Sequence, residues 1–129
     1  MEWFLLPYTK IGDFEGRSRR KEYWMFILSN ILILISVTTL ISLLKLDDYL
    51  RFYMVIHGLC YIIPVFSLWV RRLHDIGKSG TYFFVRLIPF IGGIWFLILM
   101  CTEGDKGSNK YGIDPKNPSD ELEDIGVIE

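Results

Sequence analysis

A charged segment, RRLHDIGKSG over residues 71–80, follows nineteen residues, 52–70, that contain no Asp, Glu, Lys or Arg. His74 and Asp75 are residue types that carry out general acid–base catalysis. Arginine side chains bind phosphate through the planar fork of the guanidinium group. The segment therefore raises three hypotheses: an enzyme site for lipid headgroups, a binding site for an anion, or the charged edge of a membrane span.

The spacing within this segment limits its chemistry. Neighbouring residues on a helix point about 100° apart, so adjacency does not make His74 and Asp75 a catalytic pair. Arg71 and Asp75 have the i, i+4 spacing of a helical ion pair. The GKS sequence is not a phosphate-binding P-loop, because Arg72 occupies a position that requires glycine and no strand precedes it. We therefore assign no catalytic residue, and residues 77–80 predict a helix stop and turn.

Three apolar stretches surround these residues, at about 24–44, 52–70 and 82–101. A helix needs about 20 apolar residues to cross roughly 30 Å of hydrocarbon, and each stretch has that length. The third contains Pro89, and we interpret it as one kinked span because twenty residues are too few for two crossings. The sequence predicts an all-α integral membrane protein with three transmembrane helices and a short interfacial N-terminal segment.

The domain organisation follows from these stretches. Residues 1–118 are predicted to form one membrane domain, ending in a segment rich in turn-forming residues. Residues 119–129 are predicted to be an acidic, disordered tail. With three spans, eight Lys and Arg residues flank the membrane on the N-terminal side and five on the other. The positive-inside rule then places the N-terminus in the cytoplasm and the acidic tail outside.

The second apolar stretch carries polar residues on one side. At 100° per residue, His57, Cys60, Pro64 and Ser67 fall within an arc of about 80°. This arc indicates either a polar seam facing other helices or a small aqueous pathway, or else one hydrogen-bonded histidine beside a proline kink. Cys60 and Cys101 lie at different depths, so we expect neither a disulfide nor a metal site.

The basic N-terminal block GRSRRKEYW, residues 16–24, is expected on the same side as RRLHDIGKSG, with Ser18 as the N-cap of the first span. Charges in partly desolvated surroundings are normally paired. Glu22 is therefore expected to pair with Arg71 or Arg72, and Asp75 with Arg17, Arg20 or Arg86. The candidate site is an interfacial charge cluster or an anionic headgroup site: Arg17, Arg20, Glu22, Arg71, Arg72, His74, Asp75 and Lys78, with the polar seam of His57, Cys60 and Ser67.

Four blocks in order, GRSRRKEYW, RRLHDIGKSG, IPFIGG and GDKGSNKYGIDP, resemble the small bacterial inner-membrane proteins of the YhaH/YhaI type, grouped as domain-of-unknown-function family 805. The resemblance runs from about residue 14 to residue 115. One departure is Thr81, where members of the family often have an aromatic residue. The resemblance implies a bacterial inner-membrane location and brings no established activity, cofactor or substrate.

We expect such a protein to act by association with itself, with lipid or with another membrane protein. The expected partners are anionic lipid headgroups, a second copy or another membrane protein, with no nucleic acid, cofactor or metal. One alternative is a subunit of an oligomeric transporter or channel that uses the seam. Another is an enzyme that modifies lipid headgroups through the RRLHD segment.

Overall fold

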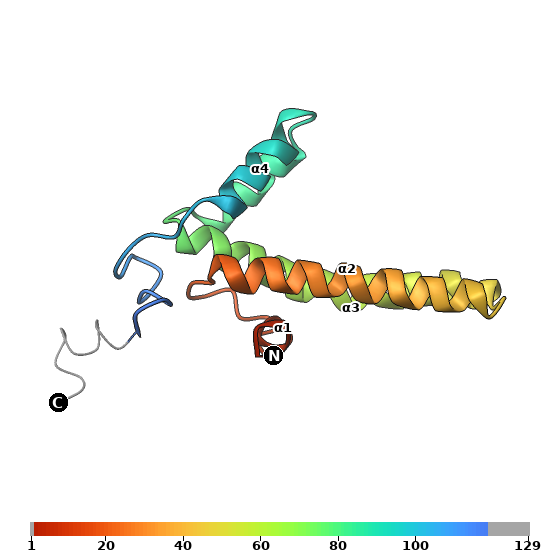
Figure 1. The fold of residues 1–129 in the computed structure, drawn as a ribbon. Coiled ribbons are helices and arrows are strands. Elements are labelled where there is room, and N and C mark those ends of the chain that lie inside the picture. Colours follow the sequence, from red (N-terminus) through yellow and green to blue (C-terminus); the bar gives the residue numbers. More distant parts are fainter. Residues whose placement is uncertain (1, 119–129) are drawn as a thin grey trace.

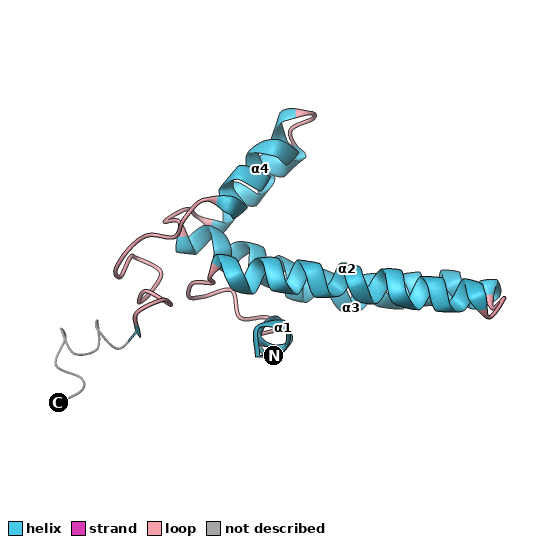
Figure 2. Cartoon of the chain, viewed as in Figure 1, coloured by secondary structure: helices cyan, strands magenta, loops and turns pink. Residues whose placement is uncertain are grey.

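The computed structural model describes residues 2–118, so the predicted disorder of residues 119–129 lies outside the described part. Within that part the fold is all-helical and has no strand, as the sequence predicts (Figure 2). The elements in chain order are α1 (Glu2–Thr9), α2 (Arg20–Leu43), α3 (Asp47–Asp75), the 3₁₀ helix η1 (Gly80–Leu87) and α4 (Ile91–Cys101).

Helices α2 and α3 form a long hairpin (Figure 1). Their 24 and 29 residues correspond to about 36 and 43 Å of helix at 1.5 Å per residue. Both exceed the roughly 30 Å of a hydrocarbon core. Apolar side chains such as Leu43 and Phe52 are largely exposed along the hairpin. Within residues 2–118, α2 and α3 are therefore the two helices that are long and apolar enough to cross a membrane.

The third apolar stretch does not form the single kinked helix that we expected. It forms η1 and α4, which are joined by Ile88, Pro89 and Phe90 and lie side by side as one arm (Figure 1). Ile88 is extended, as a residue before proline prefers to be, and Phe90 has φ +64. These two conformations reverse the chain where a kink would only have bent it. Both ends of the arm consequently lie at the same end of the molecule.

Helix α1 packs across the α2–α3 hairpin near the same end, apart from the arm (Figure 1). The Tyr8 hydroxyl donates to Asn30 Oδ1 at 2.9 Å, and the Tyr8 ring lies 5.3 Å from that of Phe26. The loop after α1 packs against α3, where the Ser67 hydroxyl donates to the Asp13 carbonyl at 2.5 Å. The N-terminal segment that we expected at the interface is thus a packed helix and loop.

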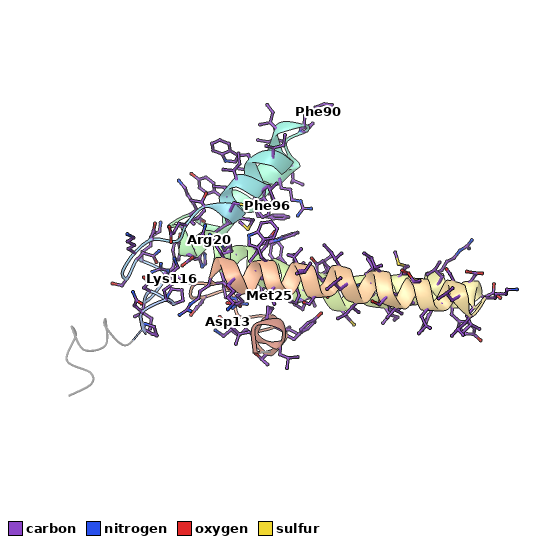
Figure 3. All side chains as sticks on the ribbon, in the orientation of Figure 1. Asp13, Arg20, Met25, Phe90, Phe96 and Lys116 are labelled. Carbon is purple, nitrogen blue, oxygen red and sulfur yellow. The ribbon has the colours of Figure 1, made fainter. Side chains whose placement is uncertain are left out.

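The buried apolar core is small and lies where α2, α3 and α4 meet. The side chains of Phe26, Leu68, Leu73 and Met100 are fully buried there. Away from this meeting point, Phe90 stands at the far end of the arm, and Phe96 lies nearer its base (Figure 3). The arm and the hairpin therefore share one packed base, and their far ends diverge.

Replacing Gly92 by alanine is expected to loosen the arm. A Cβ at this position would lie 2.1 Å from the Val85 carbonyl oxygen, so η1 and α4 would have to separate. Gly93→Ala is the matched control, since a Cβ there meets nothing within 4 Å. Alanine is favoured over glycine inside a helix by roughly 0.5–1 kcal/mol.

The thermal unfolding midpoint of the purified protein in detergent checks this. We expect a midpoint several degrees lower for Gly92→Ala and an unchanged or slightly higher midpoint for Gly93→Ala. Equal midpoints for the two variants would contradict the close packing of η1 against α4.

Candidate functional site

Charged side chains gather at the packed base, where the segment before α2, the end of α3 and the chain after α4 meet. We call this cluster the polar junction. All of its members are buried: Arg17, Ser18, Glu22, Arg71, Arg72, His74, Asp75 and Asp114.

Arg17 joins the three segments of the polar junction. Its Nε donates to Asp75 Oδ1 at 3.0 Å, within the predicted set of partners for Asp75. Its two terminal nitrogens donate to the carbonyl oxygens of Gly107 at 2.6 Å and Asp105 at 2.5 Å. The Arg17 side chain is 1% exposed. One buried guanidinium group therefore holds the end of α3 and the chain after α4 together.

Asp75 has a second arginine partner on its own helix. Arg72 Nη1 donates to Asp75 Oδ2 at 2.6 Å with i, i+3 spacing, so the i, i+4 pair with Arg71 that the sequence permits is replaced. The Asp75 carbonyl also accepts from the Asp105 N–H at 2.7 Å. A Cβ on Gly104 would lie 2.1 Å from Asp75 Oδ2, so only glycine fits against this carboxylate.

Arginines from other helices cap the C-terminal end of α4. Carbonyl groups in the last turn of a helix lack partners within the helix and carry partial negative charge. Helix α4 has no basic residue in its own last turn. Arg72 donates to the carbonyls of Met100 and Thr102, and Arg20 donates to the carbonyl of Cys101 at 3.1 Å. These contacts fix the base of the arm to α2 and α3.

Glu22 pairs with Arg71, one of its two expected partners, at 3.2 Å, and both side chains are almost fully buried. Arg71 Nε and Nη2 are buried without a hydrogen-bond partner. The prediction that Ser18 caps the first span is wrong. Helix α2 begins at Arg20 with Arg19 in the N-cap position, and the Ser18 N–H donates to the Arg71 carbonyl at 3.1 Å.

His74 is held by partners that Asp75 does not share. Its ring stacks on Tyr111 with centroids 3.9 Å apart, and its Nδ1 lies 3.2 Å from the Gly16 carbonyl oxygen. A carbonyl only accepts, so Nδ1 is the nitrogen that carries the proton. Asp75 faces Arg17 and Arg72 instead. The structure does not bring His74 and Asp75 together in the common pocket that a headgroup-modifying enzyme would need.

The chain after α4 forms turns that close the polar junction. Burial acts to raise the pKa of the Asp114 carboxyl group. The backbone N–H groups of Lys116 at 2.8 Å and Gly107 at 3.2 Å, with the charge of Arg17, outweigh it and hold this pKa below its usual value. Asp114 therefore stays ionised. From the sequence we expected only turns here. The contacts of this segment with Arg17 were not predicted, although the GDKGSNKYGIDP block marked the segment as distinctive.

Two predicted site residues lie outside the polar junction. Arg20 is exposed beside Glu103 at 3.8 Å (Figure 3). The Lys78 ammonium group lies 5.2 Å from the centroid of the Tyr82 ring.

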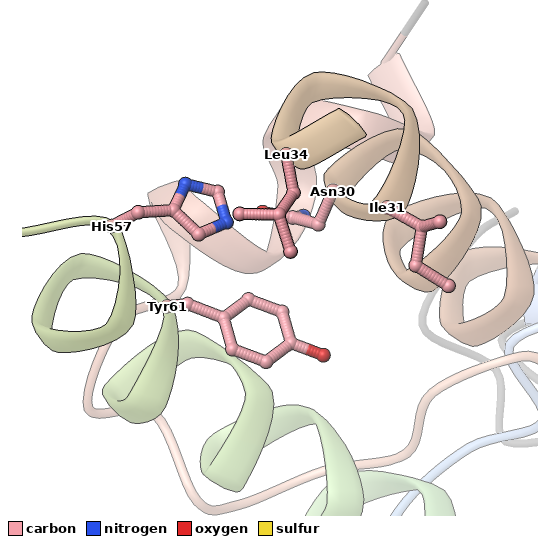
Figure 4. Close-up of a pocket in the computed structure, with 5 residues that line it drawn as sticks. All are labelled: Asn30, Ile31, Leu34, His57 and Tyr61. Atoms are coloured by element: carbon pink, nitrogen blue, oxygen red, sulfur yellow. The ribbon is translucent and has the colours of Figure 1, made fainter. Parts of the chain in front are cut away.

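The predicted polar seam on α3 is not continuous. His57 lines a cavity of about 160 Å³ between α2 and α3, together with Asn30 and Tyr61 (Figure 4). Cys60 is exposed, and Ser67 is covered by the loop after α1. The residues of the arc therefore meet three different environments.

Breaking the buried pair on one side only is expected to destabilise the fold strongly. Arg71→Met leaves the Glu22 carboxylate buried without its cation, which typically costs about 3–5 kcal/mol. The double variant Glu22→Leu, Arg71→Met removes both charges and should recover most of this loss. Lys116→Met is the matched control, because its ion pair with Glu103 is exposed and such pairs contribute about 1 kcal/mol or less.

The measurement is the free energy of unfolding by denaturant in detergent micelles. A double variant as unstable as Arg71→Met would show that Arg71 acts through other contacts than its pair with Glu22.

Comparisons with known proteins place the chain in a family. Residues 11–113 match the family described as "Protein of unknown function (DUF805)". The chain is 43% identical to inner membrane protein YhaI of Escherichia coli K12, over 90% of this chain and 97% of that protein. It is 38% identical to inner membrane protein YhaH of the same strain, over 90% of this chain and 98% of that protein. No solved structure matches. The chain therefore belongs to the DUF805 family, as the four sequence blocks indicated.

Proposed function

We propose that this chain is a bacterial inner-membrane protein that acts by non-catalytic association with membrane lipid. The observation that supports this most is the division of its surface. The side chains that carry acid–base chemistry, His74 and Asp75, are buried in separate internal contacts. The exposed surface of α2, α3 and the arm is largely apolar. Its relatives YhaI and YhaH are named inner membrane proteins.

In this proposal α2 and α3 cross the membrane, and the arm enters and returns on one side. The 8 residues of η1 and the 11 of α4 give about 16 Å each at 2.0 and 1.5 Å per residue. That is about half of the hydrocarbon thickness. The tip is apolar, with Phe90 96% exposed. A loop that emerged into water on the far side would be expected to carry polar residues.

The backbone at the tip suits an apolar environment. Polar backbone groups in lipid need partners within the protein. The N–H groups of Ile88, Ile91 and Gly92 donate to nearby carbonyl groups at 3.1, 2.7 and 2.9 Å, and Pro89 has no N–H to satisfy. The turn can therefore lie in hydrocarbon with few unpaired donors.

The charge distribution supports an orientation for this arrangement. With the arm returning, eleven of the fourteen lysines and arginines lie at the end of the polar junction, two lie near the α2–α3 turn, and Arg86 lies in the arm. The positive-inside rule then favours a cytoplasmic polar junction. With residues 82–101 as a third crossing, as the sequence predicted, Lys106, Lys110 and Lys116 would instead lie on the opposite side.

Labelling of single cysteines tests the arrangement. In a background with Cys60→Ser and Cys101→Ser, cysteine is introduced as Lys10→Cys, Asp48→Cys or Ser108→Cys. A membrane-impermeant maleimide added to intact spheroplasts should label only Asp48→Cys. Permeabilised membranes should label all three. Labelling of Ser108→Cys from outside would mean that the arm crosses the membrane, and the proposal would be wrong.

A further inference from the structure

A second polar feature lies between the arm and α2, outside the polar junction. There the side chains of Tyr23, Arg86, Phe96 and Leu97 line a cavity of about 190 Å³ together with Gly93. A Cβ on Gly93 would meet nothing within 4 Å, so the wall beside α4 is open at this position. We call this cavity the crevice.

Arg86 brings a positive charge into the crevice. Its guanidinium carbon lies 4.6 Å from the centroid of the Trp69 ring and 5.7 Å from that of Phe96. Aromatic faces attract a cation without neutralising it. Among the residues that the structure describes, no carboxylate forms a salt bridge with Arg86. By contrast, carboxylate or carbonyl partners are present for Arg17, Arg20, Arg71 and Arg72.

The depth of Arg86 suggests the anion that it would meet. The Arg86 guanidinium group lies against Trp69, so the position of Trp69 on α3 gives its depth. Trp69 precedes the last residue of α3 by six positions, which is about 9 Å along the helix. With α3 crossing the membrane, this depth is close to the boundary between headgroups and acyl chains. A cation in that zone is costly unless it meets an anion or reaches water. The guanidinium fork matches the geometry of phosphate oxygens.

The walls of the crevice suit the rest of a lipid. Phe96 and Leu97 are apolar, and the open position at Gly93 leaves room beside α4. The crevice thus combines a cation at headgroup depth with an apolar wall leading toward the tip.

We propose that the crevice holds one glycerophospholipid, with its phosphodiester on Arg86 and an acyl chain along Gly93 and Leu97. This inference rests on the proposed function, because it requires the arm to return within the membrane. It goes further by naming the lipid group that is recognised and the residues that recognise it.

Native mass spectrometry of the full chain, purified in detergent, measures this binding. The probes are dioleoylphosphatidylglycerol, dioleoylglycerol, which lacks the phosphate, and inorganic phosphate alone. We expect one tightly bound phosphatidylglycerol and no comparable binding of dioleoylglycerol. Inorganic phosphate that displaced the lipid at millimolar concentration would identify a site for free anions and overturn the lipid assignment.

Two variants test the two parts of the crevice separately. Arg86→Met removes the charge, and Gly93→Leu fills the space without changing any charge. Arg86→Met should weaken phosphatidylglycerol binding by about tenfold or more, since a charge-assisted hydrogen bond contributes about 1.5–3 kcal/mol. Gly93→Leu should also weaken this binding, because the leucine side chain occupies the space proposed for the acyl chain. Arg51→Met is the matched control: it removes an exposed cation near the far turn and should bind like the original chain.

The outcomes separate this inference from the proposed function. Circular dichroism checks that each variant folds. If Arg86→Met does not fold, Gly93→Leu still tests the crevice site by itself. Binding unchanged in Arg86→Met or in Gly93→Leu would overturn the crevice site. If cysteine labelling still places Ser108→Cys in the cytoplasm, the proposed arrangement stands and only the lipid site is wrong. Labelling of Ser108→Cys from outside would overturn both.

Discussion

The contact on which the rest of the structure depends is that of Arg17 with Asp75. These side chains come from segments 58 positions apart and meet at 3.0 Å in a buried environment. The same guanidinium group binds the carbonyls of Asp105 and Gly107. A single charged group therefore fixes where the chain enters α2, where α3 ends, and where the chain goes after α4. The base of the arm is then fixed by Arg72 and Arg20, which donate to carbonyl groups at the end of α4.

Burying so many charges is costly, and the polar junction offsets the cost by matching partners. Arg17 and Arg72 both form ion pairs with the Asp75 carboxylate, and Arg71 forms an ion pair with Glu22. The further donors of Arg72 meet carbonyl groups at the end of α4, where the helix dipole places partial negative charge. Removing one partner leaves another charge buried, whereas removing a matched pair does not. Within the junction, each matched set of charges is therefore expected to contribute to stability as a whole.

The same bonding pattern separates structural charges from the one that remains available. The arginines of the polar junction are engaged with groups of the chain itself, and their side chains are almost completely buried. Arg86 differs, because it is exposed, lies on aromatic faces and lines a cavity. A ligand anion would therefore reach Arg86 more readily than the buried arginines of the RRLHD segment, which was the candidate binding site in the sequence.

The sequence by itself determined the helical class, the two long apolar stretches that lie within α2 and α3, the family, and the pairing of Glu22 and Asp75 with arginines. Apolar length and charge pairing are local or compositional properties, so residue types sufficed for them. Only the tertiary structure decided the path of residues 82–101, because a kink and a reversal contain the same Pro89 and differ in the backbone of Phe90. It also decided that His74 and Asp75 diverge and that the chain after α4 returns to Arg17. Those outcomes depend on contacts between segments far apart in the chain, which spacing along the sequence does not encode.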